Sequence, residues 1–232
     1  MENAPLDSAV ALLIDVDGTL VDSTYLHAVS WAGALRSAGF DIPTSRVHRL
    51  IGMRGERLLT ELLGAGTADQ VAKQVQADHA SRFQAVRAQV GPLPGARALL
   101  AAAHARAVPV VLTSSAQSDE IEHYLELLDA RDLVAAWISA SDVRRSKPDP
   151  EPITLALQRS GCERGAVIGD STWDCLAAGA AGLPSIAVMT GGFAATELEE
   201  AGAALVCEHP LEVSERLETV LEFAASGGRA RS

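Results

Sequence analysis

The sequence predicts an α/β fold, in which a doubly wound parallel sheet carries an α-helical insertion. Three observations predict this class. Short apolar runs recur along the chain, and each one ends in a polar cluster. Stretches with the apolar spacing of helices separate these runs, and alternating strands and helices form sheets that are covered on both faces. The long segment 23–90 carries helical patterns and no convincing strand.

The expected strands are unbroken apolar runs, which is the pattern of strands buried on both faces of a sheet. Clear runs lie at residues 10–14, 108–112, 166–168 and 185–188, and weaker ones at 135–139 and 203–206. Helices are expected between them at residues 95–107, 119–128, 152–160 and 174–181. In such a sheet the ligand site lies beyond the carboxyl ends of the strands.

These elements divide the chain into two domains. Residues 1–22 and 91–232 are expected to form the Rossmann-like core, and residues 23–90 a helical domain inserted after the first strand. Residues 226–232, rich in Gly, Arg and Ser, are expected to form a disordered tail.

Composition and charge narrow the possible partners. With 48% hydrophobic and 21% charged residues, the chain can bury a full core. Its formal net charge of -11 argues against a nucleic-acid partner, which would need clustered positive charge. The apolar run 9–14 is too short for a membrane span. Cys162, Cys175 and Cys207 form no paired motif, so we expect reduced thiols in a cytoplasmic protein. The protein is expected to be a monomer or a homodimer.

The first polar cluster follows the first strand. Asp15 and Asp17 are two residues apart, so both carboxylates can point to one side and meet one substrate. Gly18 permits a tight turn directly after them, and Thr19 can fix that turn by hydrogen bonding. The alternative for this segment alone is a pair of solvated loop aspartates.

Two further strand ends carry groups that suit an anion. Thr113 and Ser114 offer hydroxyl and N–H groups at a strand-to-helix junction, although capping of the next helix is an alternative use. Lys147, one of two lysines in the chain, stands before a proline that restricts its backbone. A fixed ammonium there could bind phosphate beside carboxylates, whereas the alternative is a lysine in a surface loop.

The fourth cluster contains Asp170 and Asp174, again after an apolar run. Carboxylate oxygens are ligands that suit Mg²⁺. The alternative is that both residues cap the helix that follows. Taken together, the four clusters supply a nucleophile, a proton donor, phosphate-binding groups, a cation and a metal ligand, which phosphoryl transfer requires.

With these four clusters in this order, the sequence resembles the haloacid dehalogenase-like hydrolase superfamily over nearly its whole length. The resemblance implies that Asp15 attacks phosphorus and that Asp17 acts as general acid and base. It implies that Thr113, Lys147 and the backbone N–H of Ser114 bind the phosphoryl group.

The resemblance also implies a metal site. Mg²⁺ would be held by the Asp15 carboxylate, the Asp17 backbone carbonyl and Asp170, with Asp174 supporting either the metal or Lys147. The dehalogenases of the superfamily lack the second aspartate, so Asp17 favours phosphate chemistry over carbon–halogen cleavage.

The inserted domain is expected to set the substrate. It resembles the helical C1-type cap of phosphoglycolate phosphatases and β-phosphoglucomutases. Its candidate specificity residues are Ser23, His27, Arg49, Gly52 and Arg54. The two arginines could meet a second anionic group of the substrate, or be solvated helix ends.

We therefore expect a Mg²⁺-dependent phosphatase of a small phosphorylated metabolite. A phosphosugar mutase that uses the same aspartyl phosphate is the first alternative. His27 favours the mutase, because a mutase of the family has a histidine at the matching distance from its nucleophile. Gly169 before Asp170 favours the phosphatase, because glycine at this position is typical of the phosphatases. A non-catalytic binding protein is the second alternative.

Overall fold

A computed structural model describes residues 10–227 of the chain. Its centre is a six-stranded sheet in the order β3-β2-β1-β4-β5-β6, and every neighbouring pair is parallel. The strands are β1 (Val10–Ile14), β2 (Val110–Thr113), β3 (Ala136–Ile138), β4 (Arg164–Gly169), β5 (Ser185–Val188) and β6 (Ala203–Cys207). The predicted α/β fold with a parallel sheet is confirmed, including the two weaker strands.

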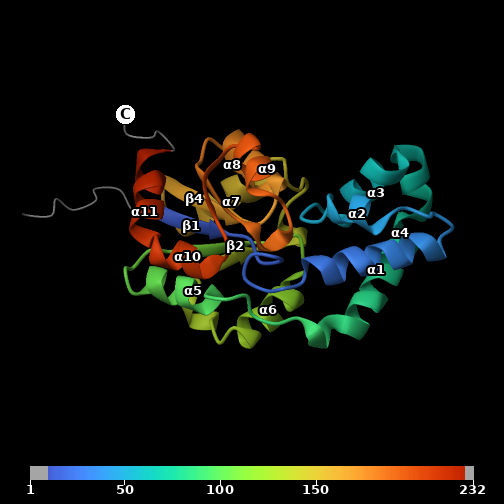
Figure 1. Ribbon diagram of the computed structural model, residues 1–232, viewed down its shortest axis with the longest axis horizontal. Coiled ribbons are helices and arrows are strands. Elements are labelled where there is room, and N and C mark those ends of the chain that lie inside the picture. The colour runs from blue at the N-terminus through green and yellow to red at the C-terminus, as the bar shows by residue number, and fades with distance from the viewer. Residues whose placement is uncertain (1–9, 228–232) are drawn as a thin grey trace, which may run out of the picture.

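Helices cover both faces of this sheet (Figure 1). They are α5 (Ala96–His104), α6 (Ser118–Leu127), α7 (Glu151–Ser160), α8 (Thr172–Ala180), α9 (Ala195–Glu200), α10 (Pro210–Glu215) and α11 (Leu217–Ser226). Successive residues of β1 point to opposite faces. Leu12 and Ile14 join the apolar cluster formed with α5, α6, α10 and α11, whereas Ala11 and Leu13 join the cluster formed with α7 and α8.

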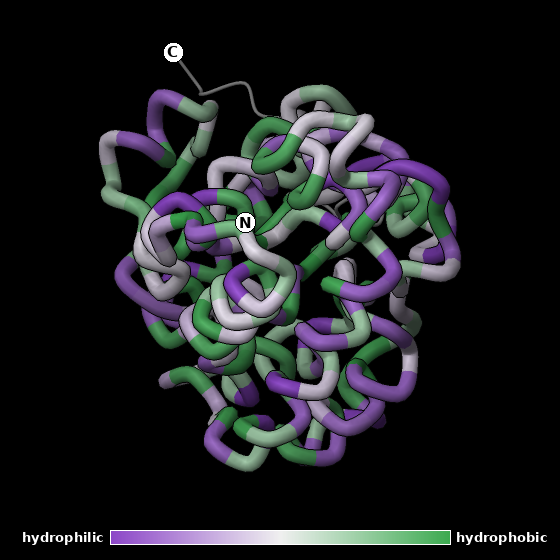
Figure 2. The backbone as a smooth tube through the Cα atoms, turned by 90° about the vertical axis from the view of Figure 1, so that its right-hand side faces the viewer, coloured by the Kyte–Doolittle hydropathy of each residue, from purple (hydrophilic) through white to green (hydrophobic). Residues whose placement is uncertain are grey.

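The first four α-helices after β1 form the helical insertion beside the sheet (Figure 1). They are α1 (Thr24–Ser37), α2 (Thr44–His48), α3 (Gly55–Leu63) and α4 (Ala65–Val86). One face of α1 is apolar, with Ala28, Trp31 and Leu35 at helical spacing. These side chains pack with those of α3 and α4 in one buried apolar cluster. Figure 2 shows hydrophilic and hydrophobic residues alternating along these helices. The insertion therefore has a core separate from those of the sheet.

The C-terminal part of the sequence forms more regular structure than its pattern predicts. Helices α9, α10 and α11 go beyond the expected elements, and Ser226, the first residue of the expected disordered tail, ends α11. The rest of that tail from 228 onwards lies outside the described residues. Within residues 10–227, no helix combines the length and the apolar character needed to cross a membrane.

Candidate active site

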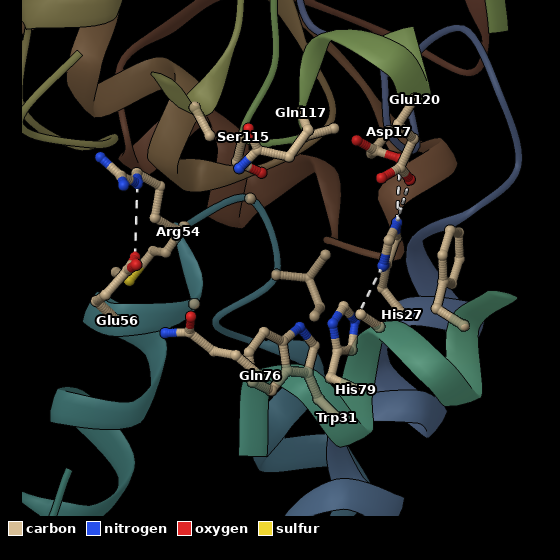
Figure 3. Close-up of a pocket in the computed structure, with 18 of the residues that line it drawn as sticks. Asp17, His27, Trp31, Arg54, Glu56, Gln76, His79, Ser115, Gln117 and Glu120 are labelled. Atoms are coloured by element: carbon tan, nitrogen blue, oxygen red, sulfur yellow. Dashed lines mark hydrogen bonds and ion pairs between the residues drawn. The ribbon is translucent and has the colours of Figure 1, made fainter. Parts of the chain in front are cut away.

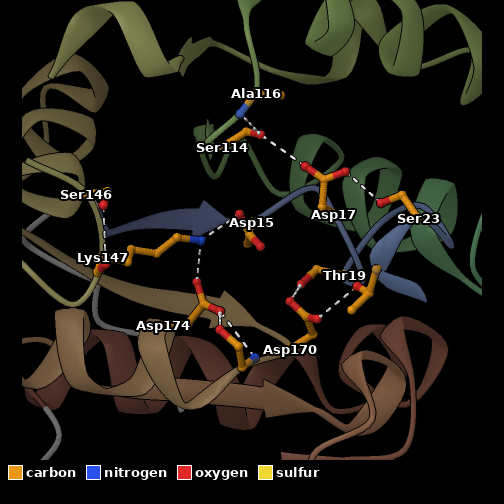
Figure 4. A network of polar contacts seen from close by, with 12 residues as sticks. Asp15, Asp17, Thr19, Ser23, Ser114, Ala116, Ser146, Lys147, Asp170 and Asp174 are labelled. Carbon is orange, nitrogen blue, oxygen red and sulfur yellow. Dashed lines mark hydrogen bonds and ion pairs between the residues drawn. The ribbon is translucent and has the colours of Figure 1, made fainter. Parts of the chain in front are cut away.

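The four polar clusters of the sequence meet at one edge of the sheet, at the carboxyl ends of its strands (Figure 4). Asp15 and Asp17 follow β1, Thr113 ends β2, Asp170 follows β4, and Lys147 lies in the loop before α7. β1 lies between β2 and β4, so the parallel order of the strands brings these residues together. All five side chains are buried.

Lys147 joins two carboxylates in the centre of this cluster. Its Nζ lies 2.8 Å from Oδ1 of Asp15 and 2.7 Å from Oδ1 of Asp174. Lys147 is 3% exposed. Burial alone would lower its pKa, but the two carboxylates raise the pKa well above its ordinary value. Lys147 is therefore a fixed positive charge. Asp174 also accepts hydrogen bonds from the N–H and hydroxyl of Ser171, so it caps α8 as well as holding Lys147.

Asp170 lies beside this pair. Its carboxylate accepts hydrogen bonds from the hydroxyls of Thr19, at 3.3 Å, and Thr24, at 3.4 Å. Carboxylate oxygens of Asp15, Asp170 and Asp174 come within 4.8 Å of one another. Burial raises the pKa of Asp15 to about 7, and repulsion from Asp174 and Asp17 adds to that rise. Burial also raises the pKa of Asp170 well above its ordinary value, with repulsion from Asp15 and Asp174 adding to it.

This donor set fits a Mg²⁺ ion. Three buried carboxylates face one ammonium, so the cluster carries more negative charge than Lys147 can offset. A hard divalent cation bound by carboxylate oxygens would remove that imbalance. Gly18 keeps the space clear, because its φ is +76° and an added Cβ would come within 2.1 Å of Oδ2 of Asp170. Asp15 and Asp170 are the residues best placed to hold the ion, since Asp174 is taken up by Lys147 and Ser171.

Asp17 points away from the other carboxylates and toward the insertion (Figure 4). Its Oδ1 accepts a hydrogen bond from the hydroxyl of Ser23 at 2.6 Å and lies 3.3 Å from Nε2 of His27. The hydroxyl of Ser114 donates to its other oxygen, Oδ2, at 3.3 Å. Burial would raise the pKa of Asp17, but the hydrogen bonds and charge of His27, with the Ser23 bond, lower it.

The phosphate-binding prediction for Ser114 needs one correction. Its backbone N–H donates to the carbonyl of Ile138 at 3.0 Å as part of the sheet, so this N–H is not free for a phosphate. The hydroxyl of Ser114 remains at the site, where it touches Asp17. Thr113 offers a clearer donor, because its buried hydroxyl has no hydrogen-bond partner among residues 10–227.

The candidate specificity residues of the insertion divide into two groups. Ser23 and His27 contact Asp17, as described above. Arg49 instead pairs with Glu197 across the two domains, and Arg54 donates to the carbonyl of Val143 at 2.9 Å. Gly52, with φ at +98°, lies against the side chain of Ser171, where an added Cβ would come within 3.2 Å. Arg49, Gly52 and Arg54 thus lie where the insertion meets the core.

A cavity of about 370 Å³ opens between the insertion and α6, with Asp17 at one end (Figure 3). His79 and Glu120 line it and were missed by the sequence reasoning. Nε2 of His79 lies 3.3 Å from Nδ1 of His27, whose Nε2 in turn lies 3.8 Å from Glu120. No spacing in the sequence marks these contacts, because α1, α4 and α6 are distant along the chain.

The chain matches known proteins over most of its length. Residues 12–188 match the family model described as haloacid dehalogenase-like hydrolase. A phosphoglycolate phosphatase from Rhodospirillum rubrum is 30% identical over 210 residues, which cover 84% of this chain and 86% of that protein. A validoxylamine A 7'-phosphate phosphatase from Streptomyces hygroscopicus subsp. limoneus is 29% identical, with 77% of this chain and 84% of that protein covered.

A solved structure agrees with this assignment. The crystal structure of a hydrolase from Pseudomonas syringae superposes with a TM-score of 0.86 at 30% identity, covering 91% of this chain and 99% of that one. The parallel sheet and its helical insertion therefore belong to a recognised architecture. This chain is a member of the haloacid dehalogenase-like hydrolases.

Proposed function

We propose that the chain is a Mg²⁺-dependent phosphatase that hydrolyses a small phosphorylated metabolite through an aspartyl phosphate on Asp15. The observation that carries the proposal is the buried 2.8 Å contact of Lys147 with Asp15, together with the buried hydroxyl of Thr113, which has no hydrogen-bond partner within residues 10–227. One site thereby holds a carboxylate nucleophile, a fixed cation and a free hydrogen-bond donor for phosphate. The phosphatase names of the relatives support the same chemistry.

Catalysis begins when a carboxylate oxygen of Asp15 attacks phosphorus. The bond from Asp15 to phosphorus forms as the bond to the leaving oxygen breaks, and Asp17 gives that oxygen a proton. The charge of the bound phosphate raises the pKa of Asp17 by repulsion, which favours the protonated acid needed here. Asp17 then takes a proton from water, whose oxygen attacks phosphorus and releases inorganic phosphate and free Asp15.

The second step, hydrolysis of the aspartyl phosphate, needs Asp17 as a carboxylate, which is the form that its contacts favour. The contacts with Ser23 and His27 stabilise its carboxylate, which is the base that activates water. Lys147 and Thr113 bind the phosphoryl oxygens throughout.

Mg²⁺ would be held by the carboxylates of Asp15 and Asp170 and by the backbone carbonyl of Asp17. When bound, the ion supplies the positive charge that lets a phosphate approach these carboxylates. EDTA should abolish phosphate release, and added Mg²⁺ should restore it. Turnover that is indifferent to EDTA would remove the metal from the proposal.

The nucleophile is tested by Asp15→Asn, which keeps the shape of the side chain but removes its charge. We expect kcat to fall by about 10³-fold or more, which corresponds to roughly 4 kcal/mol in the barrier. Release of inorganic phosphate measures turnover, and circular dichroism checks the fold. Asp22→Asn, at an exposed aspartate of the same loop, is the matched control. Near-wild-type turnover of Asp15→Asn would overturn the assignment.

A phosphosugar mutase is the second candidate, and the contact of His27 with Asp17 favours it. A mutase returns the phosphoryl group to a sugar instead of to water. Interconversion of sugar phosphates that requires a bisphosphorylated sugar, with little inorganic phosphate released, would establish this reaction. Rapid phosphate release from several simple monoesters would exclude it.

A further inference from the structure

A second group of metal-binding side chains lies at the end of the cavity, apart from the carboxylates around Lys147 (Figure 3). Asp17 follows β1, His27 lies on α1 of the insertion, and Glu120 lies on α6 of the core. Ligand atoms of these three residues lie within 4.8 Å of one another. The two domains thus bring an imidazole and two carboxylates to one point.

The spacing of these ligand atoms fits a four-coordinate zinc ion. Nε2 of His27 lies 3.3 Å from Oδ1 of Asp17 and 3.8 Å from Oε1 of Glu120. Bonds of about 2.1 Å at tetrahedral angles place neighbouring ligand atoms about 3.4 Å apart. The three side chains therefore need only small adjustments to bind one ion between them.

The chemistry of this ligand set favours a transition metal over Mg²⁺. Imidazole nitrogen binds Zn²⁺ and similar ions well, whereas Mg²⁺ is held by oxygen ligands. The carboxylates of Asp17 and Glu120, with a neutral His27, carry two negative charges, which a divalent cation balances. Asp15 and Asp170 instead offer carboxylate oxygens to an ion. The two groups of ligands therefore suit different metals.

Neighbouring hydroxyl groups hold the two carboxylates in place. The hydroxyl of Ser23 donates to Asp17 at 2.6 Å, and the hydroxyl of Tyr124 donates to Glu120 at 2.9 Å. Carboxylates that bind metals are commonly held by such hydrogen bonds, which fix the direction in which their remaining lone pairs point. Both carboxylates thus have the support that a metal ligand needs.

His27 is supported on its other side by His79. Nδ1 of His27 lies 3.3 Å from Nε2 of His79 (Figure 3). Burial lowers the pKa of His79 to about 3, so its ring is neutral and can accept a hydrogen bond from Nδ1 of His27. Phe83 stacks on His27 and Trp31 stacks on His79, which fixes both rings. A histidine whose Nδ1 donates to a neighbour presents Nε2 to a metal.

The cavity gives an ion access to these ligands. Its volume is about 370 Å³, and Asp17, His27 and Glu120 all line it. The side chains of His27 and Glu120 are 13% and 22% exposed, so a bound ion would be shielded and still reachable. Water in the cavity supplies the fourth ligand, as in zinc sites with three protein ligands.

We propose that Asp17, His27 and Glu120 form an inhibitory site for Zn²⁺ or a similar transition-metal ion. The bound ion occupies the carboxylate of Asp17 and thereby stops the proton transfers that this residue performs. It also joins α1 of the insertion to α6 of the core. The metal site goes beyond the proposed phosphatase function, whereas its inhibitory effect rests on that function.

Calorimetric titration of Zn²⁺ into the protein, with Mg²⁺ in excess, tests the site. We expect one equivalent of Zn²⁺ to bind to the wild type. Glu120→Gln keeps an acceptor for Tyr124 but removes the charge, and it should weaken Kd at least about tenfold. His27→Gln should do the same, with circular dichroism as the check on its fold. Failure of the wild type to bind Zn²⁺, or an unchanged Kd in Glu120→Gln, would overturn the proposal.

Two control variants test other places where Zn²⁺ could bind. Glu122→Gln changes an exposed carboxylate of the same helix. Cys162→Ser removes the least buried of the three free thiols. Both variants should keep the wild-type Kd, and a loss of Zn²⁺ binding in either one would place the ion elsewhere and overturn the proposal.

Hydrolysis of p-nitrophenyl phosphate measures the inhibition. The rate of each protein with Zn²⁺ is divided by its own rate without Zn²⁺, so a general loss of activity cancels. The Zn²⁺ concentration for half inhibition should rise at least about tenfold in Glu120→Gln, in step with Kd, and stay unchanged in Glu122→Gln. A half-inhibition concentration that rises in proportion to added Mg²⁺ would place Zn²⁺ at Asp15 and Asp170 and overturn the proposal.

Binding and turnover separate this inference from the proposed function. Failure to hydrolyse any phosphate ester with Mg²⁺ present, while Zn²⁺ binds as expected, would overturn the phosphatase and leave the metal site standing. Turnover with Mg²⁺ but an unchanged Kd in Glu120→Gln would overturn the metal site and leave the phosphatase standing. Zn²⁺ bound at the site without any loss of turnover would overturn the inhibitory role and the proton transfers assigned to Asp17.

Discussion

At the scale of single residues, the site is governed by an imbalance of charge. Asp15, Asp170 and Asp174 cluster around Lys147 in a buried space. Burial raises the pKa of Asp15 to about 7, above the ordinary value of 3.8 that it has in the unfolded chain. The folded, metal-free protein thus binds a proton more tightly than the unfolded chain between these two values. Its stability should therefore fall as the pH rises through this window.

Asp170→Asn should relieve part of this repulsion, because Asn can still contact Thr19 and Thr24 without a charge. In EDTA at pH 8 we expect a higher Tm than in the wild type, by about 2–4 °C for each kcal/mol gained. Mg²⁺ should raise the Tm of the wild type but not that of Asp170→Asn. Thermal unfolding followed by circular dichroism measures both effects, with Asp22→Asn as the control. An equal Mg²⁺-dependent rise in Asp170→Asn would exclude Asp170 as a ligand.

At the scale of elements, a tight turn follows Asp15 and Asp17 directly after β1. Gly18 adopts a φ of +76°, and its N–H donates to the carbonyl of Val21 at 2.8 Å. This conformation turns the chain directly after Asp17. Asp15 faces Lys147, while Asp17, directly before the turn, faces the insertion and its cavity (Figure 4).

Gly18→Ala should damage both the turn and the metal site. A left-handed conformation costs a residue with a side chain about 1–2 kcal/mol, and the new Cβ would also meet Asp170 and Thr24. Gly39→Ala is the matched control, because Gly39 has a φ of +89° and no atom within 4 Å of an added Cβ. In urea unfolding, Gly18→Ala should lose more stability than Gly39→Ala, and it alone should lose Mg²⁺-dependent phosphate release. Equal losses of stability in Gly18→Ala and Gly39→Ala would contradict a clash of the new Cβ with Asp170 and Thr24.

The sequence could predict the strands and the four clusters because each depends on a local pattern. The apolar run of β1 followed by Asp15, Asp17 and Gly18 is visible within a few residues. Contacts that depend on packing between elements could not be predicted. His27 meets His79 only because α1 packs against α4. Arg54 was a candidate for binding an anion, but the folded chain pairs it with Glu56.

At the scale of the whole molecule, polar contacts join the insertion to the core. The indole N–H of Trp173 donates to the carbonyl of Arg49 at 3.0 Å, and Nε2 of His48 lies 2.8 Å from the carbonyl of Gly191. The insertion has its own apolar cluster, although Phe83 of α4 belongs to the cluster of the sheet. A hydrogen bond contributes only about 0.5–1.5 kcal/mol, so contacts of this kind can break and re-form as substrate enters the cavity between the domains.

Trp173→Phe should weaken the contact between the insertion and the core, while the aromatic ring is kept. Loss of one hydrogen bond of about 1 kcal/mol should raise KM by roughly fivefold, with a smaller change in kcat. Steady-state kinetics of phosphate release give both constants. Trp137→Phe is the control, because Trp137 lies in β3 and stacks with Arg131, away from the insertion. A fall in kcat with KM unchanged would contradict a role of the Trp173 hydrogen bond in holding the insertion against the core when substrate binds.

The burial of Lys147 has a practical consequence for labelling the protein. Amine-directed reagents attack the neutral amine, and Lys147 is both enclosed and held in its protonated form by two carboxylates. The only other lysine, Lys73, lies exposed on α4. A fluorophore with an amine-reactive group should therefore mark a single lysine. That lysine is on the inserted domain, where the dye could report its movement against the sheet during turnover.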